Sequence, residues 1–113
     1  KGIVKTRGYH IDSYNNRFKL FMYLTNCEDI DNGPFSFILK SHNAFFFRTI
    51  SRIYNKIFMK RNTDMHIYNK LNETKIYGKS GTLFLSNQKG FHRGWPQSKN
   101  GKRLVAVLNL KIN

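Results

Sequence analysis

Cysteine is almost absent from this sequence, and no long apolar run occurs in it. Cys27 is the single cysteine of the chain, which excludes an intrachain disulfide and fits a reducing compartment. No apolar stretch approaches the roughly 18 residues that a membrane-spanning helix requires. We therefore expect a chain without a membrane span, located in the cytoplasm.

Acidic side chains are also scarce, with 6 Asp and Glu against 20 Lys and Arg and a net charge of +14. A charge of this size can indicate nucleic-acid binding. However, Lys, Asn, Ile, Phe and Tyr are abundant while Ala is rare, which is typical of a protein from an AT-rich genome. The basic residues are also scattered and form no dense block. We therefore attribute the charge mainly to genome composition and do not expect a nucleic-acid partner.

The length of 113 residues allows a single domain with one core, and we assign residues 1–113 to it. The hydrophobic content of 40% and the aromatic content of 15% predict a globular chain. Short apolar runs bounded by turn residues predict strands. They cover residues 19–25, 34–42, 65–69, 74–78, 81–87 and 102–112. The last run is long and apolar, as expected of a central strand covered on both faces.

The segment 44–60 changes period and predicts one amphipathic helix inserted among the strands. The apolar residues at helical spacing are Ile50, Ile53, Tyr54, Ile57 and Phe58. The other side carries basic residues four apart, and we expect it to be a solvated basic face: Arg48, Arg52, Lys56 and Lys60. The whole pattern predicts an all-β fold with a helical insertion, arranged as a sandwich or barrel.

Three residues have the chemistry of a metal site. His10 and Asp12 stand at i and i+2, so on a strand their side chains point to the same side. His92 lies between Gly90 and Gly94, which allow the backbone to pass close to a site. Two imidazoles and one carboxylate form the facial triad of non-haem Fe(II) oxygenases, which leaves positions open for oxygen and for substrate-derived ligands.

Arg103 follows His92 after a turn-rich segment and begins the last apolar run. On an antiparallel return strand, Arg103 would come back beside His92 and point into the same cavity. A guanidinium holds a carboxylate through two parallel hydrogen bonds. A metal triad with such an arginine predicts a co-substrate that is a dicarboxylate or keto acid, one end chelating the metal and the other paired with Arg103.

The segments "HID", "FKLFMYLTNCEDIDNGPFSFILKSH" and "GTLFLSNQKGFHRG", with the later "KR", resemble successive blocks of the phytanoyl-CoA dioxygenase family. These proteins are Fe(II)- and 2-oxoglutarate-dependent oxygenases, and the resemblance runs from residue 10 to about 110. It implies a double-stranded β-helix, a jelly-roll-like core. It also implies that His10, Asp12 and His92 are the catalytic Fe(II) ligands and that Arg103 binds the far carboxylate of 2-oxoglutarate.

The activity implied by the resemblance is hydroxylation of a small organic substrate by O2, with 2-oxoglutarate converted to succinate and CO2. Related halogenases lack the carboxylate ligand, so Asp12 favours hydroxylation or desaturation. Leu39 and Lys40 replace the family's usual Pro-Gly before Ser41-His42, and we therefore expect His42 to be structural. Family members have a long region before the His-x-Asp strand. We accordingly expect a fragment that lacks the family's N-terminal helical region.

Two alternatives remain open from the sequence. The chain could be an oxygenase fold that binds metal without a working substrate pocket. It could also be a basic β-barrel that binds nucleic acid through Arg48, Arg52 and Lys56. The strand parity of Lys19, Met22 and Tyr23 is also open, so whichever of them face inward are candidates for the cavity lining. The substrate and the oligomeric state are not specified by the sequence.

Overall fold

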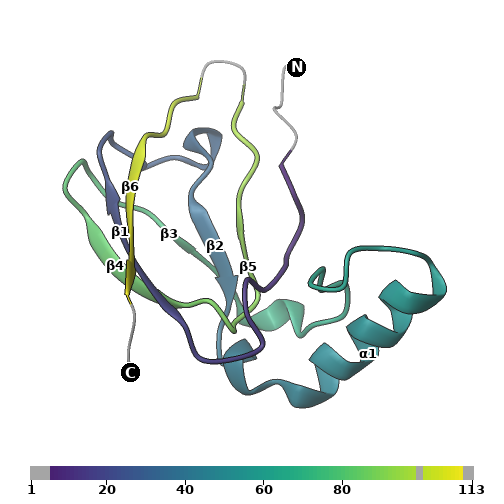
Figure 1. The fold of residues 1–113 in the computed structure, drawn as a ribbon. Helices are drawn as coiled ribbons and strands as arrows, with labels where there is room; N and C mark the ends of the chain where they lie inside the picture. The colour runs from purple at the N-terminus through teal and green to yellow at the C-terminus, as the bar shows by residue number, and fades with distance from the viewer. Residues whose placement is uncertain (1–5, 99–100, 111–113) are drawn as a thin grey trace.

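The computed structural model describes residues 6–98 and 101–110, and they form a β-rich fold of two antiparallel sheets with one α-helix. The first sheet has the order β4-β1-β6, with β4 at Leu83–Asn87, β1 at Phe18–Tyr23 and β6 at Val105–Leu110. The second has the order β3-β2-β5, with β3 at Glu73–Ile76, β2 at Phe35–Ile38 and β5 at His92–Gly94. The two sheets face each other, and α1 at Phe45–Ile57 lies to one side of them (Figure 1).

Three short 3-10 helices complete the described part: η1 at Ile30–Asn32, η2 at Ser41–Asn43 and η3 at Lys70–Asn72. The first of them, η1, ends at Gly33, which takes a φ of 70°. Within residues 6–98 and 101–110, no helix is both long and apolar enough to cross a membrane.

Aromatic rings fill the space between the two sheets. Phe21 stacks on Phe84 with ring centroids 5.0 Å apart, and Phe35 of the opposite sheet lies 4.9 Å from Phe21 and 5.1 Å from Phe84. The hydroxyl of the fully buried Tyr23 donates to the Ile76 carbonyl at 2.7 Å and accepts from the Phe35 amide at 3.0 Å. Tyr23 therefore joins the sheets by packing and by two hydrogen bonds, which satisfy polar groups that burial would otherwise penalise.

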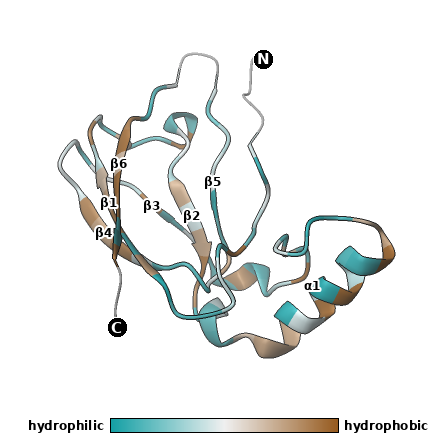
Figure 2. Ribbon diagram, viewed as in Figure 1, coloured by the Kyte–Doolittle hydropathy of each residue, from teal (hydrophilic) through white to brown (hydrophobic). Residues whose placement is uncertain are grey.

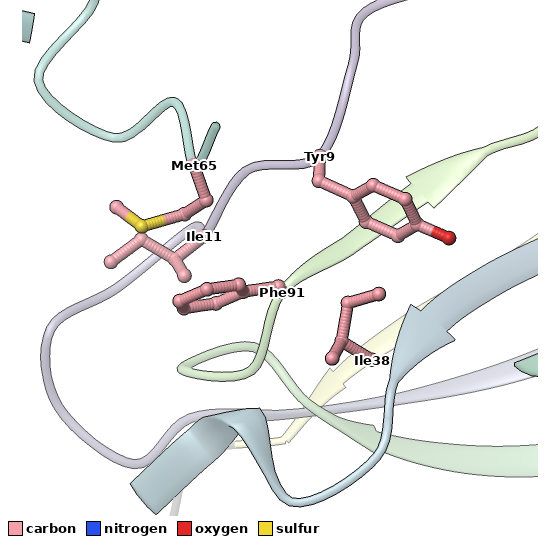
Figure 3. Close-up of a cluster of buried hydrophobic side chains, with 5 residues drawn as sticks. All are labelled: Tyr9, Ile11, Ile38, Met65 and Phe91. Atoms are coloured by element: carbon pink, nitrogen blue, oxygen red, sulfur yellow. The ribbon is translucent and has the colours of Figure 1, made fainter. Parts of the chain in front are cut away.

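A second apolar cluster packs on the outer side of the β3-β2-β5 sheet. Tyr9, Ile11, Ile38, Met65 and Phe91 are all at most 4% exposed, and their side chains point toward one another (Figure 3). Tyr9 and Ile11 come from the extended segment that carries the His-x-Asp motif. Side chains of an extended chain alternate, so the burial of Tyr9 and Ile11 in the cluster directs His10 and Asp12 to the opposite side.

The helix packs on the protein through a polar strip, and two of the apolar residues expected to be buried are exposed. Its buried residues are Arg48, Ser51 and Asn55, whereas Ile53 and Ile57 are 51% and 66% exposed. The prediction of a solvated basic face was wrong for Arg48, whose guanidinium donates to the carbonyls of Ser41 and His42. Figure 2 shows hydrophobic residues along the strands and also on α1.

Polar contacts explain this orientation. The hydroxyl of Ser51 accepts hydrogen bonds from the backbone N–H groups of His66 and Ile67, and the amide of Asn55 donates to the Asp64 carbonyl at 2.7 Å. These backbone groups belong to the loop that follows the helix and have to be paired when buried. The helix thus supplies side-chain partners that a neighbouring strand would otherwise supply.

Two strand predictions differ from the structure for the same kind of reason. Residues 65–69 form no strand, because the N–H groups of His66 and Ile67 bond to Ser51 rather than to a second strand. The run 102–112 yields the strand Val105–Leu110, with its last residues outside the described part. That strand pairs with β1 at one end of the sheet order, and Val107 and Leu108 are 48% and 58% exposed. The expectation of a central strand covered on both faces was therefore wrong.

Candidate metal centre

His10 and His92 are held together by their backbones. The amide of each residue donates to the carbonyl of the other at 3.0 Å, forming an isolated antiparallel bridge. The two imidazole rings lie in an edge arrangement with centroids 4.6 Å apart. Two residues that are far apart in sequence therefore present their side chains to one point.

A hydrogen bond to a backbone carbonyl fixes the tautomer of each histidine ring. Nδ1 of His10 lies 2.8 Å from the Gly8 carbonyl, and Nδ1 of His92 lies 2.9 Å from the Gly90 carbonyl. A carbonyl oxygen only accepts, so Nδ1 carries the hydrogen and donates in each ring. The neutral imidazole then has its lone pair on Nε2, which is the tautomer that a metal-ligating histidine uses.

Asp12 completes the group. Its backbone amide donates to the Gln88 carbonyl at 3.0 Å, which fixes the segment beside the strands. Its Oδ1 lies 3.6 Å from Nε2 of His10 and 3.5 Å from Nε2 of His92, while its Oδ2 accepts from Nζ of Lys19 at 3.1 Å. One carboxylate oxygen thus faces both imidazoles and the other is engaged by a lysine.

The electrostatics keep the ligand atoms in their metal-binding forms. The neighbouring His92 ring and then the Lys19 ammonium lower the pKa of Asp12 far below its ordinary value, and burial opposes this. Burial lowers the pKa of His10, which favours the neutral imidazole. Asp12 is therefore ionised and His10 is biased toward the neutral form that ligates.

His10, Asp12 and His92 could hold a metal ion, because one ligand atom from each lies within 4.8 Å of the others. Metal–ligand bonds of about 2.1 Å place neighbouring ligands about 3 Å apart. The distances of 3.5 and 3.6 Å from Oδ1 of Asp12 to the two Nε2 atoms are close to that spacing. Small side-chain movements are enough to bring the three atoms onto one ion.

Arg103 lines the same cavity as the three candidate ligands, a space of about 240 Å³ between the sheets. Its Nη1 donates to the Gly33 carbonyl. A Cβ added to Gly94 would lie 3.0 Å from Nη2 of Arg103, so the glycine leaves room for the guanidinium. That Gly90 and Gly94 allow the backbone to pass close to a bound metal stays a prediction.

The lining also includes residues that the sequence left open or did not indicate. Lys19 and Tyr23 face the cavity and Met22 is not part of its lining, which settles the parity of β1. Sequence reasoning missed Gln88, which is 1% exposed and whose Oε1 has no partner among the described residues. It also missed the aromatic wall. The alternation of Lys19, Phe21 and Tyr23 could have indicated this wall, but only if the register of β1 in the sheet had been known.

Three other residues with reactive or aromatic side chains are not part of the cavity lining. His66 is exposed with its ring beside Tyr54, and Cys27 is buried, which raises the pKa of its thiol. Trp95 is half-buried, and the ammonium of Lys75 lies over its ring, 3.8 Å from the ring centroid. None of these three residues lines the cavity of the candidate metal centre.

Comparison of the chain with protein-family models, with curated proteins and with solved structures gave no match.

Proposed function

We propose that this chain is the core of an Fe(II)- and 2-oxoglutarate-dependent dioxygenase that hydroxylates a small organic substrate. The observation that supports the proposal best is that His10, Asp12, His92 and Arg103 line one cavity. Two facing antiparallel sheets are compatible with the double-stranded β-helix implied by the resemblance. The double-stranded β-helix is the fold that we propose for these two sheets.

The donor set suits Fe(II). Two neutral imidazole nitrogens and one carboxylate oxygen are the ligands of non-haem Fe(II) oxygenases, whereas structural zinc sites are four-coordinate and commonly use thiolates. The one cysteine, Cys27, does not line the cavity. Three protein ligands leave other coordination positions to a chelating co-substrate and oxygen.

The cavity suits a dicarboxylate. Lys19 and Arg103 are cations in its lining, and its one acidic residue is the ligand Asp12. A dianion such as 2-oxoglutarate would therefore find positive charge near both ends, at the metal and at the guanidinium. Phe21, Phe35 and Phe84 form apolar walls around this charged interior, and their low polarity strengthens charge pairing.

In this proposal each residue has a defined task. His10, Asp12 and His92 hold Fe(II), and Arg103 pairs with the carboxylate of 2-oxoglutarate that is remote from the metal. When bound, Fe(II) with 2-oxoglutarate supplies the oxidative chemistry that consumes O2, releases succinate and CO2 and hydroxylates the substrate. Lys19 holds Oδ2 of Asp12, so that Oδ1 remains directed at the two imidazoles. The aromatic walls limit the access of water.

The test is an anaerobic titration of the chain with Fe(II) and 2-oxoglutarate, followed by the visible charge-transfer band of the chelated complex. We expect a saturable band that His92→Ala abolishes and that Arg103→Gln shifts to higher 2-oxoglutarate concentrations. His66→Ala is the matched control, because His66 is exposed and outside the cavity. A band of unchanged strength in His92→Ala would refute the metal assignment.

The same titration separates the alternatives. A protein that only binds metal would take up Fe(II) or Co(II) but give no 2-oxoglutarate-dependent band. A nucleic-acid-binding barrel would need no metal and would bind single strands with a steep dependence on salt. The side chains of Arg52 and Lys56 remain exposed for such contacts, whereas Arg48 is buried.

A further inference from the structure

A second cavity, of about 220 Å³, lies beside the candidate metal centre. The two cavities share Phe35, Phe84 and His92 in their linings. The second cavity continues along β2 and β4, at the end of the strands where His92 begins β5. His92, a candidate metal ligand, is thus part of the wall of the second cavity, whereas Arg103 lines only the first.

The floor of this second cavity is apolar. Phe37, Ile38, Ile76 and Phe91 contribute to it together with the shared rings. A dry apolar cavity of about 150 Å³ is large enough to bind benzene. At 220 Å³, this space accommodates one aromatic ring or a branched chain of similar size. The burial of such a group would provide the binding energy.

The rim is basic and has a fixed backbone. The exposed Lys40 and the half-buried His42 are part of the lining, and none of the chain's six acidic residues is. Lys40 has a φ of 66°, a conformation that few non-glycine residues adopt. Such conformations persist where the surroundings enforce them, and they occur often at ligand-binding positions.

Buried hydrogen bonds hold the rim in this conformation. The Ser41 hydroxyl donates to the Ile38 carbonyl at 2.6 Å and accepts from the Phe91 amide at 2.7 Å. Nη1 of Arg48 donates to the carbonyls of Ser41 and His42 at 3.3 and 3.2 Å. Arg48, on the packed side of α1, therefore supports the segment that contains Lys40.

We infer that this second cavity is the substrate site and that it takes a small amphipathic anion, a compact apolar group with one carboxylate. The apolar group would occupy the space next to His92, and the carboxylate would meet Lys40 and His42 at the rim. The assignment as a substrate site rests on the proposed oxygenase function. The capacity to bind such an anion does not, because the lining and the rim need no metal.

Binding can be tested on the whole chain without metal by following backbone amide signals in NMR during titration with phenylacetate. We expect saturable shifts for residues of β2 and β4 that line the cavity. Phenylacetamide, which has the same ring without the charge, should bind about threefold more weakly, as expected for one partly exposed charge contact. Equal binding of the two probes would overturn the assignment to an anion, and no saturable shift would overturn the site.

Two pairs of variants locate the ligand. Ser86→Phe adds a ring inside the cavity and should weaken phenylacetate binding by more than tenfold. Leu83→Phe is its control, because Leu83 is exposed on the same strand and outside the cavity, and this variant should bind phenylacetate normally. Lys40→Asn removes the charge with a residue that tolerates a positive φ, and it should reduce phenylacetate affinity to that of the amide. Lys60→Asn, at an exposed lysine outside this cavity, is its control. Unchanged binding in Ser86→Phe would overturn the location.

A final measurement joins the site to the metal. With Co(II) and 2-oxoglutarate bound, phenylacetate should change the visible Co(II) spectrum, since the cavity shares His92 with the metal centre. An unchanged spectrum during saturable binding would show that the cavity is not the substrate site. Failure to bind Co(II) at all would instead refute the proposed function and leave the anion-binding result standing.

Discussion

Gly94→Ala tests whether the position of Arg103 sets the affinity for 2-oxoglutarate. The added Cβ would lie 3.0 Å from Nη2 and 3.2 Å from Nη1 of Arg103, closer than ordinary van der Waals contact. The φ of Gly94 is not positive, so alanine imposes no backbone strain there. The guanidinium, as the far end of a flexible side chain, moves away by a few tenths of an ångström at little cost in stability.

The movement should nevertheless weaken co-substrate binding. A misplacement of 1 Å can cost about 100-fold in function, so a shift of a few tenths should raise the Kd for 2-oxoglutarate by about tenfold, or about 1.4 kcal/mol. The Kd is measured from the charge-transfer band under anaerobic conditions, and stability from urea denaturation. Fe(II) affinity and the free energy of unfolding should stay close to those of the parent protein.

Gly8→Ala is the matched control, because a Cβ at Gly8 would meet no atom within 4 Å. It removes a glycine near the metal centre without touching Arg103. If Gly94→Ala binds 2-oxoglutarate as tightly as Gly8→Ala and the parent protein, Arg103 does not hold the co-substrate. A large loss of stability in Gly94→Ala would show that the guanidinium cannot move as described.

Three further outcomes are expected. Tyr23→Phe leaves the buried Phe35 amide without its acceptor and should cost about 1–3 kcal/mol in urea denaturation; an unchanged midpoint would refute the role of this hydroxyl. Ser51→Ala removes the acceptor of two loop amides, one of them from His66, and should speed their hydrogen exchange; equal rates would count against the account of how the helix packs. Burial lowers the pKa of His10 in the folded protein. At pH values near and below the ordinary histidine pKa, the unfolded chain therefore binds more protons than the folded protein. The urea midpoint of metal-free protein should therefore fall from pH 7.5 to 5.5, and fall less in His10→Gln.

The candidate ligands were predictable because their signal is local or chemical. An extended His10-x-Asp12 places both side chains on one side, and the neighbouring Tyr9 and Ile11 provide the apolar residues that turn them there. His92 and Arg103 could be added to this pair because a second imidazole completes a metal triad and a guanidinium binds the carboxylate of a co-substrate. The structure brings all four to one cavity.

The failed predictions concern burial rather than residue type. The helix was placed by its period, but its orientation depended on which backbone groups of residues 61–67 needed partners, and Ser51 and Asn55 supplied them. The edge position of β6 depended on the order of strands in the sheet. Neither is encoded in the hydrophobic pattern of one segment.

The sequence by itself therefore determined the β-rich class, the position of the one described α-helix and the identity of the three candidate ligands, because strand alternation, helical period and side-chain chemistry are local properties. Only the tertiary structure decided that Lys19 and Tyr23 face the cavity, that the helix buries its polar side and that a second cavity adjoins His92. These features arise from the register of β1 and the packing of the two sheets, which involve residues distant in the chain.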